Sequence, residues 1–209
     1  MLDSCGLALP IPHFIDSVCL GGQTYIVMAR ISGNSLLSEI QEGHPTDEDL
    51  RAIVDEIHAV LRQLWTFEQP ARDANKVVLS ASGHGLPDPL DHLAAAPGRS
   101  CTALAIPSSM DFRAKEPELI RTVTADRIIC ANIDLKPYYI LEKDGALSGI
   151  IDWGRPGWLP RHWQLHALRN WAFTNPPQPR RMWNETKFPE VTEAAFQASL
   201  KLVRYPISA

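Results

Sequence analysis

The longest regular pattern of apolar residues lies between Thr46 and Trp65. Large apolar residues recur there at intervals of three and four: Leu50, Ile53, Val54, Ile57, Val60, Leu61 and Leu64. This spacing places them on one face of an α-helix, and Thr46 with Asp49 resembles a capping box at its start. The pattern therefore predicts a helix whose apolar face packs in the core. His58 lies off that face, so we expect it in solvent.

A second pattern, of short apolar runs bounded by turn residues, predicts strands. Residues 23–31 are rich in β-branched and aromatic side chains and follow a Gly-Gly pair, which indicates a strand after a tight turn. Residues 127–130 and 149–151 are two further apolar runs. Between them, the sequence Lys-Asp-Gly at residues 143–145 is typical of a β-hairpin turn.

An aspartate follows each of these two apolar runs. Asp134 lies shortly after the first run, and Asp152 lies directly after the second. Each acid taken alone has a purely structural explanation, because a turn aspartate caps backbone amides and an aspartate at a strand end can hold a hairpin. Taken together, with a hairpin between them, the two carboxylates are expected to share one pocket.

The rest of the chain adds helices and irregular segments. Helical segments are expected at residues 35–42, 115–124, 158–173 and 191–203. Proline fixes φ and lacks a backbone N–H, so its clusters should mark irregular connections. The prolines gather mainly at residues 10–12, 87–97 and 176–189. Residues 75–110 are rich in Gly, Pro and Ser, with weak strand character at 76–79. The order of elements predicts an α+β fold rather than regular βαβ alternation.

The composition narrows the class of protein. Of the 209 residues, 45% are hydrophobic and 21% are charged, which is typical of a globular protein with a core. A formal charge of −4 gives no electrostatic reason to expect nucleic acid or an anionic membrane as a partner. No apolar run approaches the roughly 20 residues of a membrane span, and the first residues lack the basic start of a signal peptide.

The cysteines give no sign of a metal or disulfide framework. Cys5, Cys19, Cys101 and Cys130 are scattered along the chain without a CxxC pair. We therefore expect neither a structural zinc site nor dense disulfides, and we expect a reducing, cytoplasmic setting.

The two aspartates also match the spacing of a catalytic and metal-binding arrangement. In kinases, a first Asp orients or deprotonates the attacking hydroxyl group. An Asn five residues later and a second Asp hold Mg²⁺, and the metal bridges the phosphates. The separation of Asp134 from Asp152, with a hairpin between them, suits that layout.

These residues make the chain resemble the aminoglycoside phosphotransferase and choline kinase-like family, particularly its fungal branch. The family pattern His-Gly-Asp-Leu-x-x-x-Asn-Ile-Leu matches residues 132–141, and the pattern Ile-Ile-Asp-Trp-x-x-x-Gly-Trp-x-Pro-x-x-Trp matches residues 150–163. The resemblance covers most of residues 8–175. It implies a kinase-like α+β fold, with an N-lobe remnant and hinge at residues 1–33 and a helical C-lobe carrying the acid-bearing hairpin at residues 34–209.

Several positions depart from the family pattern. Tyr139 stands where the family has its metal-binding Asn, Asn132 replaces the motif His, and Ile133 replaces the motif Gly. A phenol is a poor ligand for Mg²⁺ beside a carboxamide. Ahead of residue 23 we find neither a glycine-rich loop nor a strand Lys with its helix Glu, which in the family cradle the phosphates. We therefore expect a truncated N-lobe and no cofactor, with ATP and Mg²⁺ as the alternative.

Asp134 and Asp152 are the candidate catalytic residues. Further residues are expected to bind a small organic substrate in the resulting cleft: Asn132, Lys136, Tyr138, Tyr139, Trp153, Trp158, His162 and His166. Lys136 is also placed to neutralise Asp134. His162 and His166 share a helix face at four-residue spacing, but no third ligand is identifiable, so we expect no metal site.

Three functions remain open at this stage. The first is a kinase-fold enzyme of secondary metabolism that has abandoned ATP and performs acid–base cyclisation, isomerisation or elimination. A partly desolvated Asp has a raised pKa and serves as an acid or base near neutrality. The second is an ATP- and Mg²⁺-dependent small-molecule phosphotransferase, and the third is a non-catalytic pseudokinase that binds a ligand or partner. A C-lobe without its full N-lobe would expose apolar surface, which makes a homodimer a further expectation.

Overall fold

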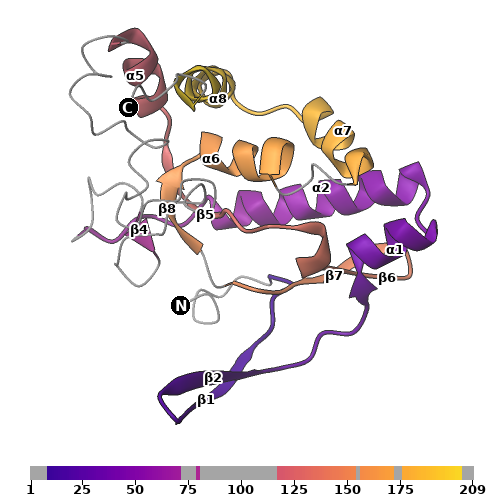
Figure 1. The fold of residues 1–209 in the computed structure, drawn as a ribbon. Coiled ribbons are helices and arrows are strands. Elements are labelled where there is room, and N and C mark those ends of the chain that lie inside the picture. Colours follow the sequence, from indigo (N-terminus) through magenta and orange to yellow (C-terminus); the bar gives the residue numbers. More distant parts are fainter. Residues whose placement is uncertain (1–8, 72–78, 81–116, 154–155, 172–175, 204–209) are drawn as a thin grey trace, which may run out of the picture.

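The computed structural model describes residues 9–71, 79–80, 117–153, 156–171 and 176–203. The proline-rich segment at 87–97 and most of the weak strand at 76–79 lie outside these residues. Within them, the chain combines small antiparallel sheets with helices, as expected for an α+β fold (Figure 1). In this described part, no helix is both long enough and apolar enough to span a bilayer.

Helix α2 (Asp47–Leu64) forms the centre of the core. Its capping box is present: the Asp49 N–H donates to Thr46 Oγ1 at 3.1 Å, and the Thr46 N–H donates to the Asp49 carboxylate at 2.9 Å. All seven residues of the predicted apolar face are buried. Both predictions for this helix are confirmed.

The expectation for His58 was wrong. The side chain is partly buried, and its ring lies 5.1 Å from the ring of Phe188 and 5.8 Å from that of Trp65, centroid to centroid. Burial lowers the pKa of His58, and the nearby charge of Arg62 acts in the same direction. The periodic pattern could not show this, because the covering rings belong in part to a distant segment of the chain.

The predicted hairpin is part of a three-stranded sheet in the order β3-β6-β7 (Asn34–Ser35, Ile140–Lys143 and Ala146–Ile150). Asp144 and Gly145 form its turn with φ of 55° and 82°. Two successive positive φ angles are the signature of the turn that suits the twist of a two-residue hairpin. The Asp-Gly signal in the sequence therefore placed this turn correctly.

A second three-stranded sheet has the order β4-β8-β5 (Leu79–Ser80, Pro156–Pro160 and Ile128–Asn132). Strand β8 corrects the prediction of a helix from residue 158. It pairs with β5 over five residues, with Cys130 opposite Trp158. The helix begins only at α6 (His162–Leu165) and continues as a π-helical segment, η4 (His166–Trp171).

The remaining helices are α1 (Leu36–Glu42), α5 (Pro117–Thr124), α7 (Pro177–Glu185) and α8 (Glu190–Val203). Three of them confirm the predicted segments, whereas α7 lies where an irregular connection was expected. Pro177 and Pro179 lie in its first turn. Backbone N–H groups of a first turn have no acceptor within the helix, so proline is tolerated there. Figure 1 shows α6 between α2 and α8, and the sheet containing β6 and β7 on the other side of α2.

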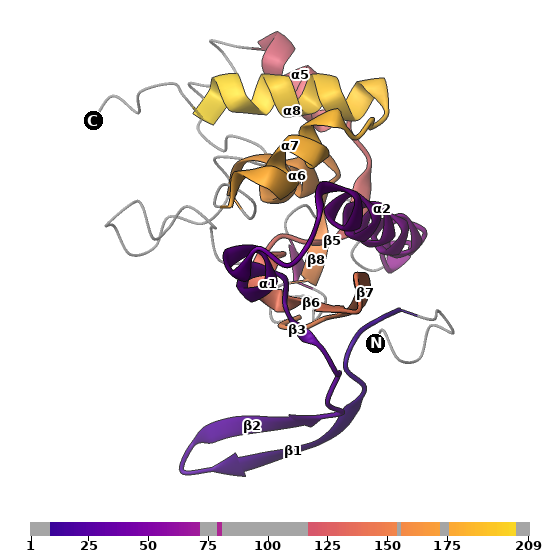
Figure 2. The same ribbon diagram turned by 90° about the vertical axis from the view of Figure 1, so that its right-hand side faces the viewer.

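Strands β1 (Phe14–Leu20) and β2 (Gln23–Met28) form a separate two-stranded hairpin. The strand predicted after the Gly-Gly turn is confirmed, while β1 was not foreseen. Figures 1 and 2 both show this hairpin reaching away from the rest of the chain.

A buried carboxylate joins three of the elements. Asp126, two residues before β5, is 4% exposed and accepts hydrogen bonds from the His162 N–H (2.6 Å), Thr192 Oγ1 (2.9 Å) and the Arg127 N–H (3.0 Å). His162 Nδ1 lies 3.1 Å from the same carboxylate, and Arg161 lies 3.7 Å away. These contacts connect β5 to the start of α6 and to α8.

His166, one turn beyond His162, is held neutral. Its Nε2 lies 2.6 Å from Ser199 Oγ, whose own proton is donated to the Phe196 carbonyl at 2.8 Å, so Nε2 is the donor. The other ring nitrogen faces the Asn170 side-chain amide at 3.4 Å. Burial lowers the pKa of His166 to about 3, and the neighbouring His162 adds to this effect.

Replacing Asp126 by Asn should lower the free energy of unfolding by about 2–4 kcal/mol. The amide would present its NH₂ group to donors that now meet a carboxylate, and it would remove the buried negative charge. Urea denaturation at pH 7 measures this change. Asp55→Asn, on the exposed face of α2, is the matched control and should shift the free energy by less than about 0.5 kcal/mol. Equal effects of the two substitutions would contradict the role assigned to Asp126.

Wild type and Asp126→Asn should also differ in how the free energy of unfolding depends on pH. Burial alone would raise the pKa of Asp126, but the hydrogen bonds from His162 and Thr192 hold the pKa below its usual value. The stability that the carboxylate contributes is therefore complete above about pH 4 and is lost as the pH falls through the lowered pKa. The difference between wild type and Asp126→Asn should shrink in that acidic range.

Candidate functional site

Asp134, the first candidate acid, lies on a loop that is held in place by two buried side-chain amides. Asn132, the last residue of β5, is 1% exposed, and its Oδ1 accepts the Asp134 N–H at 3.0 Å. Gln164 of α6 bonds to both backbone groups of Asn132, donating to its carbonyl at 2.9 Å and accepting its N–H at 3.2 Å. These bonds fix the backbone on both sides of the loop, whereas the buried Asn132 Nδ2 makes no hydrogen bond to the residues that the structure describes. Asn132 therefore supports Asp134 rather than facing solvent.

Gln164 was missed by the sequence analysis. It lies 32 residues from Asn132, and a lone Gln in an apolar segment gives no signal of such a pairing. Only the packing of α6 behind β5 brings the two amides together.

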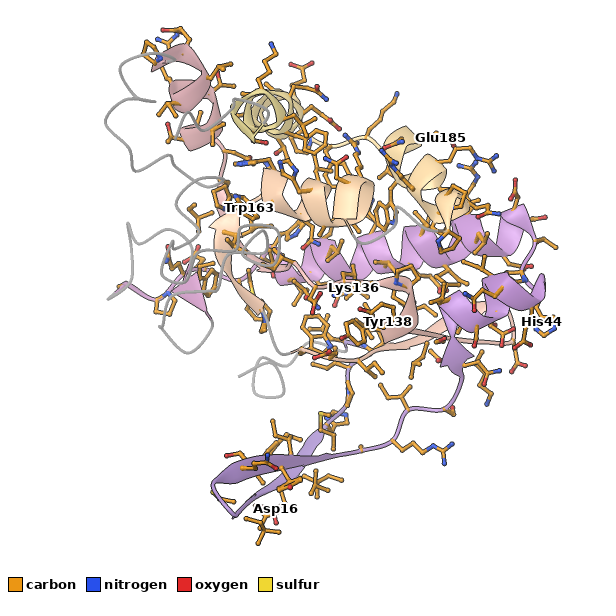
Figure 3. All side chains as sticks on the ribbon, viewed as in Figure 1. Asp16, His44, Lys136, Tyr138, Trp163 and Glu185 are labelled. Atoms are coloured by element: carbon orange, nitrogen blue, oxygen red, sulfur yellow. The ribbon has the colours of Figure 1, made fainter. Side chains whose placement is uncertain are left out.

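Asp134 forms an ion pair with Lys136 at 2.6 Å. The Lys136 Nζ also lies 5.5 Å and 5.7 Å from the ring centroids of Tyr138 and Tyr139, and Figure 3 shows Lys136 beside Tyr138 below helix α2. Burial opposes the charged form, but hydrogen bonding to Asp134 and Tyr138 outweighs it and raises the pKa of Lys136 above its usual value. Lys136 therefore keeps its charge, and the prediction that it neutralises Asp134 agrees with this geometry.

The two tyrosines form a single turn between the acids. Residues Pro137–Tyr139 make one 3₁₀ turn, in which the Tyr139 N–H donates to the Lys136 carbonyl at 2.9 Å. The Ile151 N–H donates to the Tyr139 carbonyl at 2.8 Å, which ties this turn to the end of β7. The two tyrosine rings meet edge to face at 4.3 Å between centroids.

The second acid acts on the Tyr139 phenol. Hydrogen bonding to Asp152 raises the pKa of Tyr139 well above its usual value, with burial and Tyr138 acting in the same direction. An anionic phenolate beside a carboxylate is unfavourable, so Tyr139 stays protonated and donates its hydrogen bond. Asp134, Lys136, Tyr138, Tyr139 and Asp152 thus form a continuous group, which we name the acid–tyrosine cluster.

Asp152 has an unusual backbone conformation. Its φ is 56°, in the left-handed region that non-glycine residues seldom occupy, although Asp is among those that tolerate it best. The side chain is exposed. The next residue, Trp153, is partly buried and donates its indole N–H to the Ile150 carbonyl at 2.7 Å. That bond spans Asp152 and holds the chain reversal after β7.

Three predicted substrate ligands lie in the core with other partners. Trp158 of β8 is 3% exposed and packs with Cys130, Phe67 and Ile128. His162 is fully buried against Asp126, and His166 is buried against Ser199. These residues support the scaffold. The cluster instead brings together Lys136, Tyr138 and Tyr139 with both acids.

The donor set of the cluster does not fit a magnesium–nucleotide site. Lys136 occupies one carboxylate and Tyr139 the other, and the position of the motif amide holds a neutral phenol, which is a poor ligand for Mg²⁺. Among the described residues, no group of three or more His, Cys, Asp or Glu side chains is arranged to hold a metal ion. What the cluster offers is a carboxylate base, a fixed cation and a neutral phenol whose proton is directed to Asp152.

Neither a protein-family model nor a curated protein sequence matches the chain. Solved structures do match it. An apo structure of a thermostable mutant of aminoglycoside phosphotransferase APH(4)-Ia aligns with a TM-score of 0.55 and 15% identity, over 95% of this chain and 69% of that one. ADP-bound APH(2'')-Ib aligns with a TM-score of 0.52 and 15% identity, over 95% and 66%. The gentamicin–APH(2'')-IIa complex aligns with a TM-score of 0.54 and 16% identity, over 96% and 67%.

At 15–16% identity, these likenesses concern the fold alone. They agree with the α+β arrangement of small sheets and helices described above. The predicted fold class is confirmed: this chain has the kinase-like fold of the aminoglycoside phosphotransferases.

Proposed function

We propose that this chain is an enzyme that acts on a small organic molecule by acid–base chemistry, without ATP. The observation that carries the proposal is the pairing of both acids within the chain, Asp134 with Lys136 and Asp152 with Tyr139. In a phosphotransferase, these acids would serve the attacking hydroxyl group and the metal. In this chain, Lys136 pairs with the first acid and the Tyr139 phenol pairs with the second.

Asp134 is the proposed base. Lys136 contacts Oδ1 at 2.6 Å, which leaves the other carboxylate oxygen for a substrate proton. The buried amides of Asn132 and Gln164 fix the loop, and a fixed base reacts without a costly reorganisation of its surroundings. The permanent charge of Lys136 would stabilise negative charge that develops on the substrate beside the carboxylate.

Tyr139 is the proposed positioning residue. Its raised pKa means that it keeps its proton near neutrality, and because that proton is directed to Asp152, the phenolic oxygen is left to accept a hydrogen bond from a substrate O–H or N–H. Asp152 holds the phenol, and the exposed ring of Tyr138 supplies an aromatic surface beside it. A base after β5 and a hydrogen-bond acceptor in the turn before β6 suit proton removal at one substrate atom and orientation of the substrate through another.

This arrangement favours reactions in which a proton moves and no phosphoryl group is transferred. Cyclisation, isomerisation and elimination are the classes within its reach. A role in fungal secondary metabolism and a cytoplasmic location belong to the same proposal. The first rests on the resemblance of the two motifs to the family's fungal branch, and the second rests on the scattered cysteines.

A phosphotransferase is the second candidate. The chain shares its fold with proteins solved with ADP and with gentamicin, and its two acids stand at the positions of the family pattern. A non-catalytic binding protein is the third candidate, because fold by itself does not fix activity. The experiments below separate the three candidates.

The alkaline titration of the tyrosines tests the geometry of the cluster without a substrate. The chain has four tyrosines, and the one at position 139 should ionise well above pH 10. Absorbance at alkaline pH should show this late-ionising group in wild type and lose it in Tyr139→Phe. Asp152→Asn removes the neighbouring charge and should return the pKa of Tyr139 toward its usual range. No difference between Asp152→Asn and wild type would refute the contact.

Asp134→Asn tests the base. The substitution preserves shape and removes proton transfer, so turnover should fall by roughly 10²–10⁴. The substrate would be found by screening small molecules for stabilisation against heat. Asp144→Asn is the matched control: it lies in the β6–β7 turn at φ 55°, where Asn is well tolerated, and turnover should stay unchanged. Full turnover by the Asp134→Asn variant would show that another residue acts as the base.

Nucleotide binding separates the first two candidates. ATP with Mg²⁺ should leave the melting temperature of wild type unchanged, because tight ligands stabilise by mass action and the cluster lacks the donors for them. Tyr139→Asn restores the amide of the family pattern and should still show no ATP-dependent stabilisation. A gain of ATP-dependent stabilisation or of phosphotransfer in this variant would favour the phosphotransferase instead.

A further inference from the structure

A pocket with a volume of about 250 Å³ lies between helix α2 and the segment that begins with helix α7. Four residues of α2 line it at intervals of three and four, which places them along one side of the helix: Arg51, Val54, Asp55 and His58. None of the residues that line it belongs to the acid–tyrosine cluster. Pockets that take drug-sized ligands begin at roughly 300 Å³, so this one suits a smaller molecule.

The opposite wall comes from Met182 and Glu185 of α7 and from Lys187 just beyond the helix. Figure 3 shows Glu185 on α7, beside α2. An ion pair joins the two walls, since Arg51 Nη1 lies 3.0 Å from Glu185 Oε2. Val54 and Met182 are both buried, so they give the pocket an apolar inner surface.

The charged groups of the pocket are balanced in number but only partly paired. Arg51 and Glu185 neutralise each other. Asp55 and Lys187 line the same pocket, and neither forms an ion pair with another residue in the described part of the chain. A ligand with only a negative charge would meet the Asp55 carboxylate, and one with only a positive charge would meet the Lys187 ammonium group. A ligand with both charges can pair with both.

His58 is a polar group of this pocket that the proposed chemistry of the cluster does not use. Aromatic rings pack around its imidazole, and among the described residues it makes ring contacts but no hydrogen bond. Burial lowers the pKa of His58 below its usual value, so the ring is neutral at pH 7. A neutral imidazole offers a ligand one hydrogen-bond donor and one acceptor.

The backbone that carries Lys187 is held on both sides. The Thr186 N–H donates to the Met182 carbonyl at 3.1 Å, and the Thr186 carbonyl accepts from Arg169 Nη2 at 3.0 Å. Phe188, the next residue along the chain, is 8% exposed and belongs to the core. Because the start of the Lys187 side chain is fixed, less freedom is lost when its ammonium group binds a ligand.

We propose that this pocket binds a free α-amino acid with a compact apolar side chain. Lys187 pairs with the amino acid's carboxylate and Asp55 with its ammonium group, and the apolar side chain packs on Val54 and Met182. His58 contributes a hydrogen bond from the neutral imidazole. A molecule this short reaches both charges because both line one small pocket. The site is independent of the acid–base chemistry proposed for the acid–tyrosine cluster.

Isothermal titration calorimetry of the full chain at pH 7 tests this site with L-valine, L-leucine and L-methionine as probes. At least one of the three should bind at millimolar concentration or below. The N-acetyl derivative and the amide of that amino acid each keep only one of the two charges, so each should bind at least about tenfold more weakly. The proposal fails if none of the three binds, or if either derivative binds as tightly as the amino acid.

Two variants test the residues that recognise the charges. Asp55→Asn and Lys187→Gln each remove one charge and should weaken binding at least about tenfold. Both residues are exposed, so the variants should remain folded. Glu48→Gln on α2 and Lys201→Gln on α8 are the matched controls, because they remove the same charges from exposed positions outside the pocket. Both controls should bind like wild type. Equal binding by the pocket variants and the controls would refute the site.

Asp134→Asn separates this pocket from the acid–tyrosine cluster. It changes the proposed base and leaves the residues between α2 and α7 untouched. Binding of the amino acid should therefore equal that of wild type, whether or not the cluster is catalytic. A loss of binding in Asp134→Asn as large as that in Asp55→Asn would place the amino acid at the cluster and overturn the proposal.

Discussion

A carboxylate removed from water must be surrounded by donors, and that requirement organises this fold around Asp126. The group is buried just before β5, where leaving it unpaired would cost several kcal/mol. Its partners come from three places: the adjoining Arg127, the start of α6 and the first turn of α8. These segments can satisfy the charge only when each is in place. The carboxylate therefore couples the position of β5 to that of two helices that follow much later in the chain.

The candidate site depends on this coupling. Because His162 is held at the start of α6, Gln164 two residues later reaches the backbone of Asn132 at the other end of β5. Asn132 then fixes the amide of Asp134. The path from the buried Asp126 to the partly buried Asp134 runs through a short series of hydrogen bonds that pass through β5 and α6. A site built in this way holds its geometry better than one carried by a free loop.

The acid–tyrosine cluster and the fold around it suggest different functions. The fold is shared with proteins solved with ADP and with gentamicin, and in this chain one acid follows β5 and the other follows β7. Their partners within this chain, however, are a lysine and a phenol. Since function depends on the groups in a site rather than on the scaffold, the partners carry more weight than the fold in the proposed chemistry.

The sequence by itself determined what depends on near neighbours. The apolar face of α2, the capping box of Thr46 and Asp49, and the Asp-Gly turn are all set within a few residues, so periodicity and turn chemistry predicted them. The tertiary structure decided the rest. Strand β8 exists because β5 offers a distant edge to pair with, and α7 begins at prolines that a purely local argument assigns to a loop.

The same distinction holds for the side chains. His162 and His166 have the spacing of a site, but burial against Asp126 and Ser199 makes them part of the core, and Gln164 gave no local signal at all. Burial and hydrogen-bond partners depend on residues more than thirty positions away, and a local pattern contains no information about which distant groups it will meet.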